Sequence, residues 1–466
     1  MRQAGPMTDV QQVDLVVVGL GPGGETLANA TASAGLRVVA VDSRLVGGEC
    51  PYFGCVPTKM MVRASDVVAE AGRAVALAGE VTMHPRWAPV AERVAVQATD
   101  HWDDRVAVER LERAGATVVH GVGRLAGVRR VTVTPTDGSE PVTFEAAKGV
   151  VLNPGTRPAT PPIDGLAGTP YWTNREAVQV TELPGSLVVI GGGPIGCELA
   201  QVFARFGVQV TVVQHGDRLL PANEPEAAAI LTEVFAAEDI RVVTGDDPVA
   251  ATYAEGRFTL TLESGEEVSA DQVLIAAGRT PNLDDLGLET VGLDPSARTI
   301  PVDERMRAGD GLWVIGDVTG HGAFTHVSMY QNAIARRDIL GEAGPPAAYH
   351  ALPHVTFTDP EVAGVGMSEA QARAAGIEVR IGSTPLEAST RGFTHGAGSQ
   401  GLVKLVEDAQ RGVLVGATVV GPYGGEIIGF LAVAVHAAVP VETLRSMIFA
   451  YPTFHRAIES ALADLS

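Results

Sequence analysis

The residues of this 466-residue chain whose types and spacing suggest chemistry most directly are Cys50 and Cys55. In a regular α-helix, residues five positions apart are separated by about 7.5 Å along the axis, whereas a disulfide requires Cα atoms within about 4.4–6.8 Å. The pair can close only where the helix start is distorted, which Pro51 and Gly54 permit. Because so small a ring stabilises the fold by only about 2 kcal/mol, we interpret the pair as a reducible, reactive bond. A helix N-terminus also lowers the pKa of a thiol and favours the thiolate.

Two glycine-rich turns have the spacing of nucleotide-binding turns. The first contains Gly19, Gly21 and Gly24 after a strand expected over 15–20, and the second contains Gly191, Gly193 and Gly196 after a strand over 186–190. In each, the first glycine permits a tight turn, the second lets the backbone approach a pyrophosphate, and the third allows a helix to pack closely on the strand. The helix N-terminus supplies amide donors to the phosphates. Two such units predict two bound nucleotides.

The two units differ at the end of the strand that follows each glycine turn. Asp42 ends that strand in the first unit, where an acid accepts hydrogen bonds from ribose hydroxyls. The second unit has Gln214 at the corresponding place, followed by His215 and Arg218. Without a carboxylate, a 2′-phosphate meets no repulsion, and His215 or Arg218 can pair with it. We therefore expect NADPH to be favoured over NADH.

Composition excludes several classes of protein. With 34 Lys and Arg against 55 Asp and Glu, the net charge is −21, which repels nucleic acids and anionic lipid. The longest apolar runs, 15–18 and 187–190, are too short to span a bilayer. Three cysteines argue against a disulfide-stapled secreted scaffold, and residues 1–14 lack the pattern of a signal peptide. We expect a cytoplasmic protein with no nucleic acid partner, no membrane insertion and no metal ligands.

Strand-like β-branched runs alternate with Ala-rich helical stretches through most of the chain, which predicts an α/β fold with parallel sheets. The glycine turns divide this region into two Rossmann-like dinucleotide-binding domains. From about residue 346 the pattern changes to longer strands and one apolar helix, which is typical of a separate α+β domain.

Across nearly its whole length the chain resembles the pyridine nucleotide–disulfide oxidoreductases, the family of dihydrolipoamide dehydrogenase, glutathione and mycothione reductases and mercuric reductase. Residues 47–59 look like the family's redox motif, G-G-x-C-x4-C-[VI]-P-[ST]-K. Four later segments resemble its other motifs: the A-T-G turn with Gly155 (150–156), the G-R-x-P-N loop with Gly278 (276–282), the second FAD motif ending in Gly316 and Asp317 (312–317), and the opening of the dimerisation domain (357–366).

The resemblance implies a domain order and roles for these residues. An FAD domain (1–154) would be interrupted by an NAD(P) domain (155–280), resume over 281–345, and be followed by a dimerisation domain (346–466). FAD would lie on the first glycine turn and Asp42, with Asp317 on its ribityl chain, and NAD(P)H on the second turn. Hydride would pass to the flavin and electrons to the disulfide, with Cys55 facing the flavin and Cys50 attacking the substrate. Lys59 would lie by the flavin, paired with Glu198, where its charge stabilises the reduced ring.

The chain departs from the family pattern near its C-terminus. The family's disulfide reductases carry the motif His-Pro-Thr-x-x-Glu, in which the partner subunit supplies the His as acid/base and the Glu orients it. This chain has Tyr451 in place of that His and Arg456 in place of that Glu. Because a tyrosine is a poor proton acceptor at neutral pH, three hypotheses stay open. In the first, His455, one helical turn later, takes the place of the missing histidine. In the second, the substrate is one that needs no such base, such as a quinone or a metal ion. In the third, the cysteines perform a specialised redox step. Glu49, where Thr is typical, would also disfavour a thiolate at Cys50.

The sequence therefore predicts a homodimeric NAD(P)H-dependent FAD oxidoreductase whose active site is completed by the partner's C-terminal domain. A small disulfide-type molecule is the first candidate substrate. A quinone or a metal ion, as in mercuric reductase, is the alternative acceptor. A flavin-containing redox sensor that does not turn over is a third hypothesis, motivated by the altered C-terminal motif.

Overall fold

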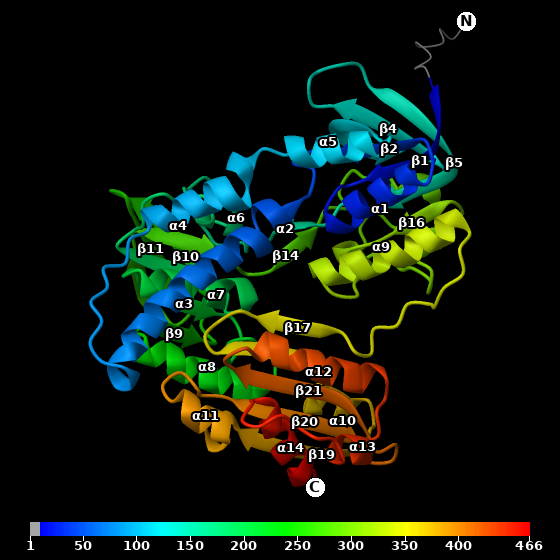
Figure 1. Ribbon diagram of the computed structural model, residues 1–466. Helices are drawn as coiled ribbons and strands as arrows, with labels where there is room; N and C mark the ends of the chain where they lie inside the picture. Colours follow the sequence, from blue (N-terminus) through cyan, green and yellow to red (C-terminus); the bar gives the residue numbers. More distant parts are fainter. Residues whose placement is uncertain (1–9) are drawn as a thin grey trace, which may run out of the picture. The chain divides into compact units, whose positions relative to one another are not determined.

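The computed structural model describes residues 10–466. Residues 1–9 belong to the N-terminal segment in which we expect no signal peptide, and they lie outside the described residues. The chain forms two compact units (Figure 1). The first comprises the chain up to Pro57 together with Ala95–Pro158 and Arg279–Ala348, and the second comprises Thr58–Val94, Ala159–Gly278 and Tyr349–Ser466. No helix of the described residues is long and apolar enough to cross a membrane.

The first unit contains a largely parallel sheet. Strand β1 (Val10–Val18) pairs in parallel with β2 (Val38–Asp42) and β5 (Val142–Leu152); β2 also pairs with β3 (Thr117–Leu125), and β5 with β16 (Leu312–Val314). Strand β4 (Arg130–Pro135) pairs antiparallel with β3 and β5, and β15 (Arg307–Gly309) antiparallel with β16. A short ribbon joins β6 (Thr156–Pro158) to β14 (Arg279–Pro281).

The side chains of β1 alternate between the two faces of this sheet. Leu15 and Val17 are fully buried in the core shared with α1 (Pro22–Ser33), α5 (Arg105–Arg113) and α9 (Thr325–Leu340). Val16 and Val18 point to the opposite core, with residues of β3, β4 and β5. Because neighbouring side chains of a strand point to opposite faces, one strand contributes to both cores, and its carboxyl end meets the N-terminus of α1.

The second unit contains the other glycine turn. Its parallel sheet has the order β13-β7-β8-β9, formed by Gln272–Ile275, Ser186–Ile190, Gln209–Gln214 and Arg241–Thr244. An antiparallel sheet follows: β10 (Pro248–Ala254), β11 (Arg257–Leu262) and β12 (Glu267–Ala270). The helices of this region are α3 (Cys55–Leu77), which begins in the first unit, α4 (Ala88–Arg93), α6 (Asn174–Ala177), α7 (Pro194–Arg205) and α8 (Pro225–Ala237).

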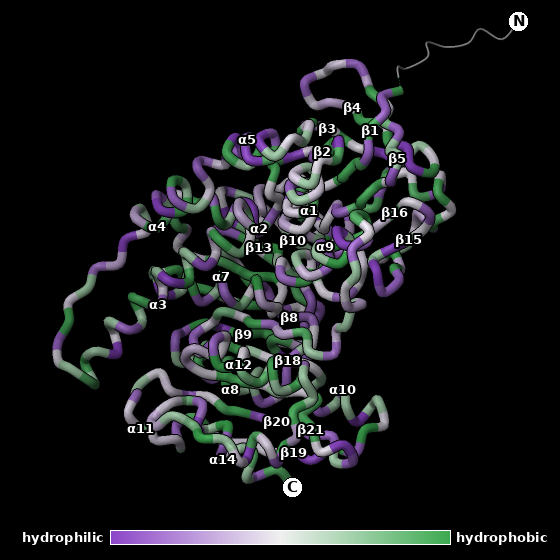
Figure 2. Tube along the Cα trace, turned by 45° about the vertical axis from the view of Figure 1, so that its right-hand side comes forward, coloured by the Kyte–Doolittle hydropathy of each residue, from purple (hydrophilic) through white to green (hydrophobic). Residues whose placement is uncertain are grey.

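The C-terminal part of the second unit is an antiparallel sheet with the order β17-β18-β21-β20-β19. The strands are Pro353–Thr356, Glu361–Gly366, Val413–Gly421, Leu402–Asp408 and Val379–Pro385. Residues of β20 and β21 form one core with α12 (Gly424–His436), α13 (Val441–Arg445) and α14 (His455–Asp464). Shorter helices α10 (Glu369–Ala374) and α11 (Thr390–His395) lie between the strands in sequence. In Figure 2 β20 and β21 are largely hydrophobic, whereas the exposed helix α5 is largely hydrophilic.

The expected fold class is thereby confirmed: two parallel α/β sheets, each opening on a glycine turn, and a C-terminal α+β region. The exact domain boundaries stay a prediction.

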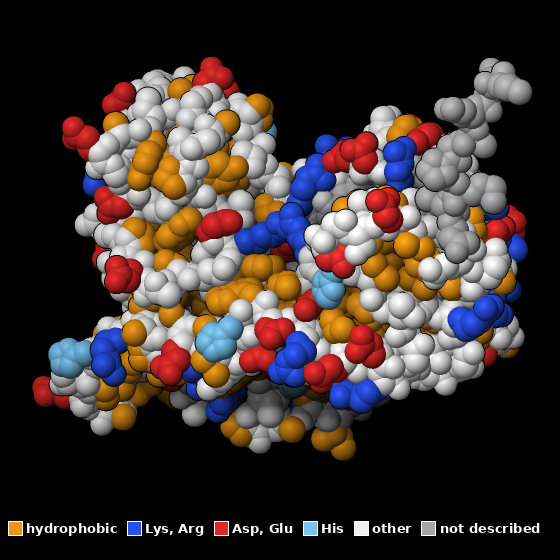
Figure 3. Space-filling model, turned by 90° about the horizontal axis from the view of Figure 1, so that it is seen from above, with side chains coloured by type: hydrophobic (Ala, Val, Ile, Leu, Met, Phe, Trp, Pro, Cys, Tyr) orange, Lys and Arg blue, Asp and Glu red, His pale blue; other side chains and the backbone are white. Residues whose placement is uncertain are grey.

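Acidic and basic side chains are scattered among apolar ones across the face shown in Figure 3.

One buried charge cluster ties β20 to α8 and α10 within the second unit. The Lys404 ammonium lies 3.1, 2.8 and 2.9 Å from carboxylate oxygens of Glu224, Glu226 and Glu369. Burial on its own lowers the pKa of Lys404, but the hydrogen bonds that its ammonium donates to these carboxylates raise it above its usual value. The Lys404 side chain is 5% exposed and that of Glu224 3%, whereas that of Glu226 is 48% exposed.

We expect Glu224→Gln to lower the free energy of unfolding by about 3 kcal/mol, because it removes a buried partner from a buried charge. Glu226→Gln, the same change on the same lysine in an exposed position, should cost less than about 1 kcal/mol. Chemical denaturation of the two variants and the wild type measures the difference. Equal losses would show that burial does not decide the strength of these pairs.

Candidate active site

The helical path is interrupted between the two cysteines. Helix α2 (Glu49–Tyr52) ends before Phe53, whose φ of −133° is not helical, and α3 begins at Cys55. The local distortion that a disulfide would require is therefore present. The side chains of Cys50 and Cys55 are hydrogen-bonded to each other.

Both thiols lie at the start of α9. The Thr325 hydroxyl, on the first residue of that helix, is 3.5 Å from the Cys55 sulfur and also hydrogen-bonds Cys50. The hydrogen bond with Cys55 and burial raise the pKa of Cys50 far above its usual value, while Thr325 opposes them. The positive end of the α9 dipole favours negative charge beside it. Sequence reasoning missed Thr325, which is 270 positions from Cys55.

The first glycine turn forms a tightly packed cradle. Gly19 has a φ of +91°, and a Cβ on Gly24 would lie 2.1 Å from the Gly19 carbonyl oxygen, so only glycine fits. The Leu20 amide donates to Asp42 Oδ2 at 2.7 Å, which fixes the acid beside the turn. Burial raises the pKa of Asp42 above its usual value. The Asn153 backbone amide donates to the Val18 carbonyl at 2.8 Å, which brings the segment before Gly155 against the end of β1 where this turn begins.

Asp317 is held in the same unit. It begins a short 3-10 helix (Asp317–Thr319), and its Oδ2 accepts a 2.6 Å hydrogen bond from the Thr156 hydroxyl. The preceding Gly316, with a φ of +83°, donates its amide to Gln331 Oε1 at 2.6 Å. The turn, Asp42 and Asp317 are thus all positioned by side-chain contacts within one compact unit, as an FAD site requires.

The second glycine turn repeats the first. Gly191 has a φ of +111°, and a Cβ on Gly196 would lie 1.9 Å from the Gly191 carbonyl oxygen. The Gly192 amide donates to Gln214 Oε1 at 2.7 Å, so Gln214 takes the structural place that Asp42 has in the first unit. A Cβ on Gly193 would meet no protein atom within 4 Å, as expected where a pyrophosphate approaches the backbone.

The two cations near Gln214 have different partners. The exposed His215 pairs through Nδ1 with Asp247, and Arg218 donates to the Pro221 carbonyl at 3.1 Å. Gly278 lies in the G-R-x-P-N-like loop with a φ of +113° and open space on its Cβ side.

Lys59 and Glu198 are in contact. The ammonium nitrogen lies 2.5 Å from Glu198 Oε2, and the Glu198 side chain is only 6% exposed. Glu198 Oε1 accepts a hydrogen bond from the Phe357 amide at 2.9 Å, and the Lys59 ammonium lies 4.7 Å from the Phe357 ring centroid. The pair is therefore held from three sides within the second unit, although its catalytic role stays a prediction.

Tyr451 and His455 are not brought together with other candidate residues inside the second unit. Tyr451 is 67% exposed, and the Arg456 guanidinium lies 5.6 Å from its ring centroid. His455 begins α14, with its ring edge-on to Phe430. The roles of Tyr451 and His455 stay a prediction.

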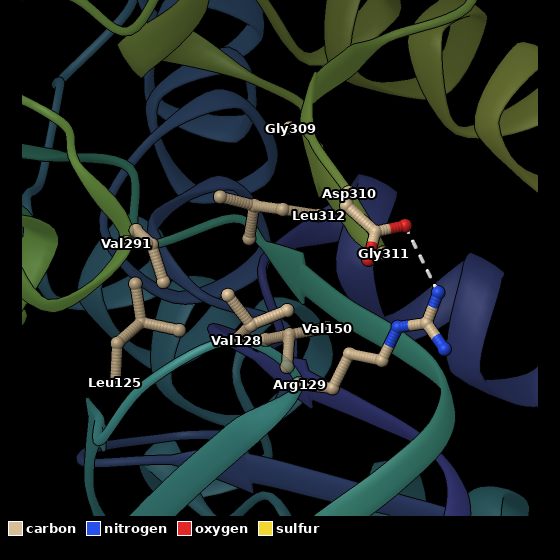
Figure 4. Close-up of a pocket in the computed structure, with 9 residues that line it drawn as sticks. All are labelled: Leu125, Val128, Arg129, Val150, Val291, Gly309, Asp310, Gly311 and Leu312. Atoms are coloured by element: carbon tan, nitrogen blue, oxygen red, sulfur yellow. Dashed lines mark hydrogen bonds and ion pairs between the residues drawn. The ribbon is translucent and has the colours of Figure 1, made fainter.

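Figure 4 shows a pocket in the first unit that contains none of the predicted site residues. Apolar side chains such as Leu125, Val150 and Leu312 line it, and Arg129 pairs with Asp310 at 3.0 Å on one side. Among residues 10–466, no group of three or more His, Cys, Asp or Glu side chains could hold a metal ion.

Comparisons with known proteins agree with this geometry. The model of the pyridine nucleotide-disulphide oxidoreductase family matches residues 13–336, and its dimerisation domain matches residues 352–462. The chain is 34% identical to the dihydrolipoyl dehydrogenase of Thermus scotoductus, over 97% of each chain. It is 33% identical to a mercuric reductase of Acidithiobacillus ferrooxidans, over 98% of this chain and 83% of the relative.

A solved structure is also similar. The Cu(II) complex of the HOCl-induced flavoprotein disulfide reductase RclA from Escherichia coli superposes with a TM-score of 0.85 and 25% identity, over 97% of this chain and 99% of that one. The resemblance proposed from the motifs is confirmed, and the chain belongs to the FAD-dependent pyridine nucleotide–disulfide oxidoreductases, with the family's dimerisation domain.

Proposed function

We propose that this enzyme uses NAD(P)H to reduce a small disulfide-type substrate through Cys50 and Cys55. The observation that carries the proposal is the meeting of the two sulfurs at the start of α9. The same compact unit holds the glycine cradle, Asp42 and Asp317. A purely structural disulfide would need neither the helix N-terminus nor this proximity to a nucleotide cradle.

FAD would be held by Gly19, Gly21, Gly24 and Asp42, with Asp317 on its ribityl chain. Both Gly19 and Gly24 sit where a Cβ would clash with backbone, which is the packing that a pyrophosphate cradle needs. When bound, FAD supplies the two-electron relay between nicotinamide and the cysteine pair. The Lys59 charge, fixed by Glu198, would stabilise negative charge on the reduced ring.

NAD(P)H would dock on Gly191, Gly193 and Gly196. The neutral Gln214 gives a 2′-phosphate no repulsion, and the cations His215 and Arg218 follow it in the sequence. We therefore propose a preference for NADPH.

The substrate step is thiol–disulfide exchange. Cys50, after losing its proton, attacks one substrate sulfur, forming a mixed disulfide and releasing the first thiolate, which is protonated. Cys55 as thiolate then attacks the Cys50 sulfur, re-forms the internal disulfide and releases the second thiolate. Overall, a disulfide, NAD(P)H and one proton give two thiols and NAD(P)⁺. Cys55 fits the second attack because its side chain is hydrogen-bonded with that of Cys50.

The active site would be completed in a homodimer, in the cytoplasm, by the partner's C-terminal domain. Tyr451 or His455 would then protonate the leaving thiolate. The exposure of Tyr451 leaves it accessible to such a site.

A second candidate function is reduction of a quinone or a metal ion. The loss of the C-terminal acid/base pair favours it, because such acceptors need no protonated leaving group. The similarity to a mercuric reductase and to RclA, solved with Cu(II), points the same way.

Anaerobic titration of the purified flavoprotein with NADPH, and separately NADH, tests the proposal. We expect a long-wavelength absorbance band, which arises when a thiolate lies against the flavin, followed by turnover with low-molecular-weight disulfides. Bleaching of the flavin without that band would remove the cysteines from the electron path and favour quinones or metal ions. No turnover with any acceptor would instead favour a redox sensor.

A further inference from the structure

Glu49, directly before Cys50, is paired with an arginine that is far away in the sequence. Arg279 Nη2 lies 3.6 Å from Glu49 Oε2, and both side chains are about three-quarters buried, with exposures of 22% and 26%. A carboxylate alone beside a thiol disfavours the thiolate, so the sequence predicted a handicap at Cys50. The structure places a compensating positive charge on that carboxylate.

Arg279 is itself firmly positioned. Its Nε donates to the Thr156 hydroxyl at 2.6 Å and its Nη2 to the Thr156 carbonyl at 2.8 Å. The same hydroxyl donates to Asp317, the acid expected on the ribityl chain, at 2.6 Å. A continuous chain of contacts therefore runs from Asp317 through Thr156 and Arg279 to Glu49 and the redox segment.

We propose that Arg279 is a positioning residue that sets the reactivity of Cys50 by holding and neutralising the Glu49 carboxylate. The inference rests on the proposed function only in taking Cys50 as the sulfur that meets substrate. Cys55 and Thr325 hydrogen-bond Cys50, and the Glu49–Arg279 ion pair is formed by the residue directly before it in the sequence. Glu49 and Arg279 carry opposite charges. Removing the Glu49 charge should therefore raise the reactivity of Cys50, and removing the Arg279 charge should lower it.

The test is the rate of alkylation of Cys50 by iodoacetamide in the reduced holoprotein, followed by mass spectrometry from pH 6.5 to 9. A shift of about one pKa unit changes the thiolate fraction about tenfold, and the accompanying change in nucleophilicity returns about a factor of three. Below the thiol pKa we expect Glu49→Gln to accelerate alkylation about threefold and Arg279→Gln to slow it about threefold. The double variant should react like the wild type.

Arg37→Gln is the matched control, because Arg37 pairs with Asp14 in the same unit but away from the cysteines in sequence, and its alkylation rate should not change. A double variant as slow as Arg279→Gln, or an unchanged rate in Glu49→Gln, would overturn the proposal. If Arg279→Gln does not fold, the alkylation rates of Glu49→Gln and Arg279→Lys test the proposal instead. Arg279→Lys keeps the positive charge and should retain part of the wild-type alkylation rate. Alkylation requires neither NAD(P)H nor substrate, so this result stands apart from failure of the proposed reductase activity.

Discussion

Cys50→Ser and Cys55→Ser are each expected to lower disulfide reduction by NADPH about a thousandfold or more, because each removes a sulfur that forms and breaks bonds. Their spectra should differ. In the proposed arrangement Cys55 faces the flavin, so Cys50→Ser should keep the long-wavelength band, whereas Cys55→Ser should lose it. Steady-state assays with a disulfide, combined with visible absorbance of the same preparations, measure both effects.

Cys197→Ser is the control for these variants. That cysteine is buried in α7 and donates to the Gly192 carbonyl at 3.3 Å, and it belongs to the compact unit that does not contain the redox pair. It should keep both the activity and the band. Disulfide reduction that survives in both Cys50→Ser and Cys55→Ser would remove the pair from the reaction. Quinone reduction that survives in both would establish a direct flavin route.

Local spacing explains which parts of the site were predictable. The glycine turns, the interruption between Cys50 and Cys55 and the equivalence of Asp42 and Gln214 all depend on residues within about 25 positions of one another. Each follows from strand–turn–helix geometry, which fixes where the backbone amides point. The amide of the residue after the first glycine donates to the side chain at the end of the next strand in both units.

The contacts that tune the cysteines were not predictable from spacing. Thr325, at the start of α9, contacts Cys55 across 270 positions, and Arg279, in the strand β14 that pairs with β6, reaches Glu49. The sequence shows that Glu49 is unusual but contains no local signal for its partner. Glu198 likewise binds the Phe357 amide through a fold-level contact across 159 positions.

Gly196→Ala is expected to weaken NADPH binding at least about a hundredfold, because its Cβ would lie 1.9 Å from the Gly191 carbonyl oxygen. Relieving such a clash costs about 3 kcal/mol, which corresponds to about two orders of magnitude in affinity. The change should also lower the melting temperature, since α7 would move away from β7. FAD content should persist, because the first glycine turn belongs to the other unit.

Gly193→Ala separates cofactor contact from folding in the same turn. Its Cβ would meet no protein atom within 4 Å, so the melting temperature should stay at the wild-type value. NADPH binding should still fall, because we propose that the pyrophosphate approaches the bare backbone of this glycine. Titration of flavin reduction against NADPH, with thermal melts of both variants, measures the two effects. Wild-type NADPH affinity in Gly193→Ala would mean that the dinucleotide does not use this turn, whatever the effect of Gly196→Ala on stability.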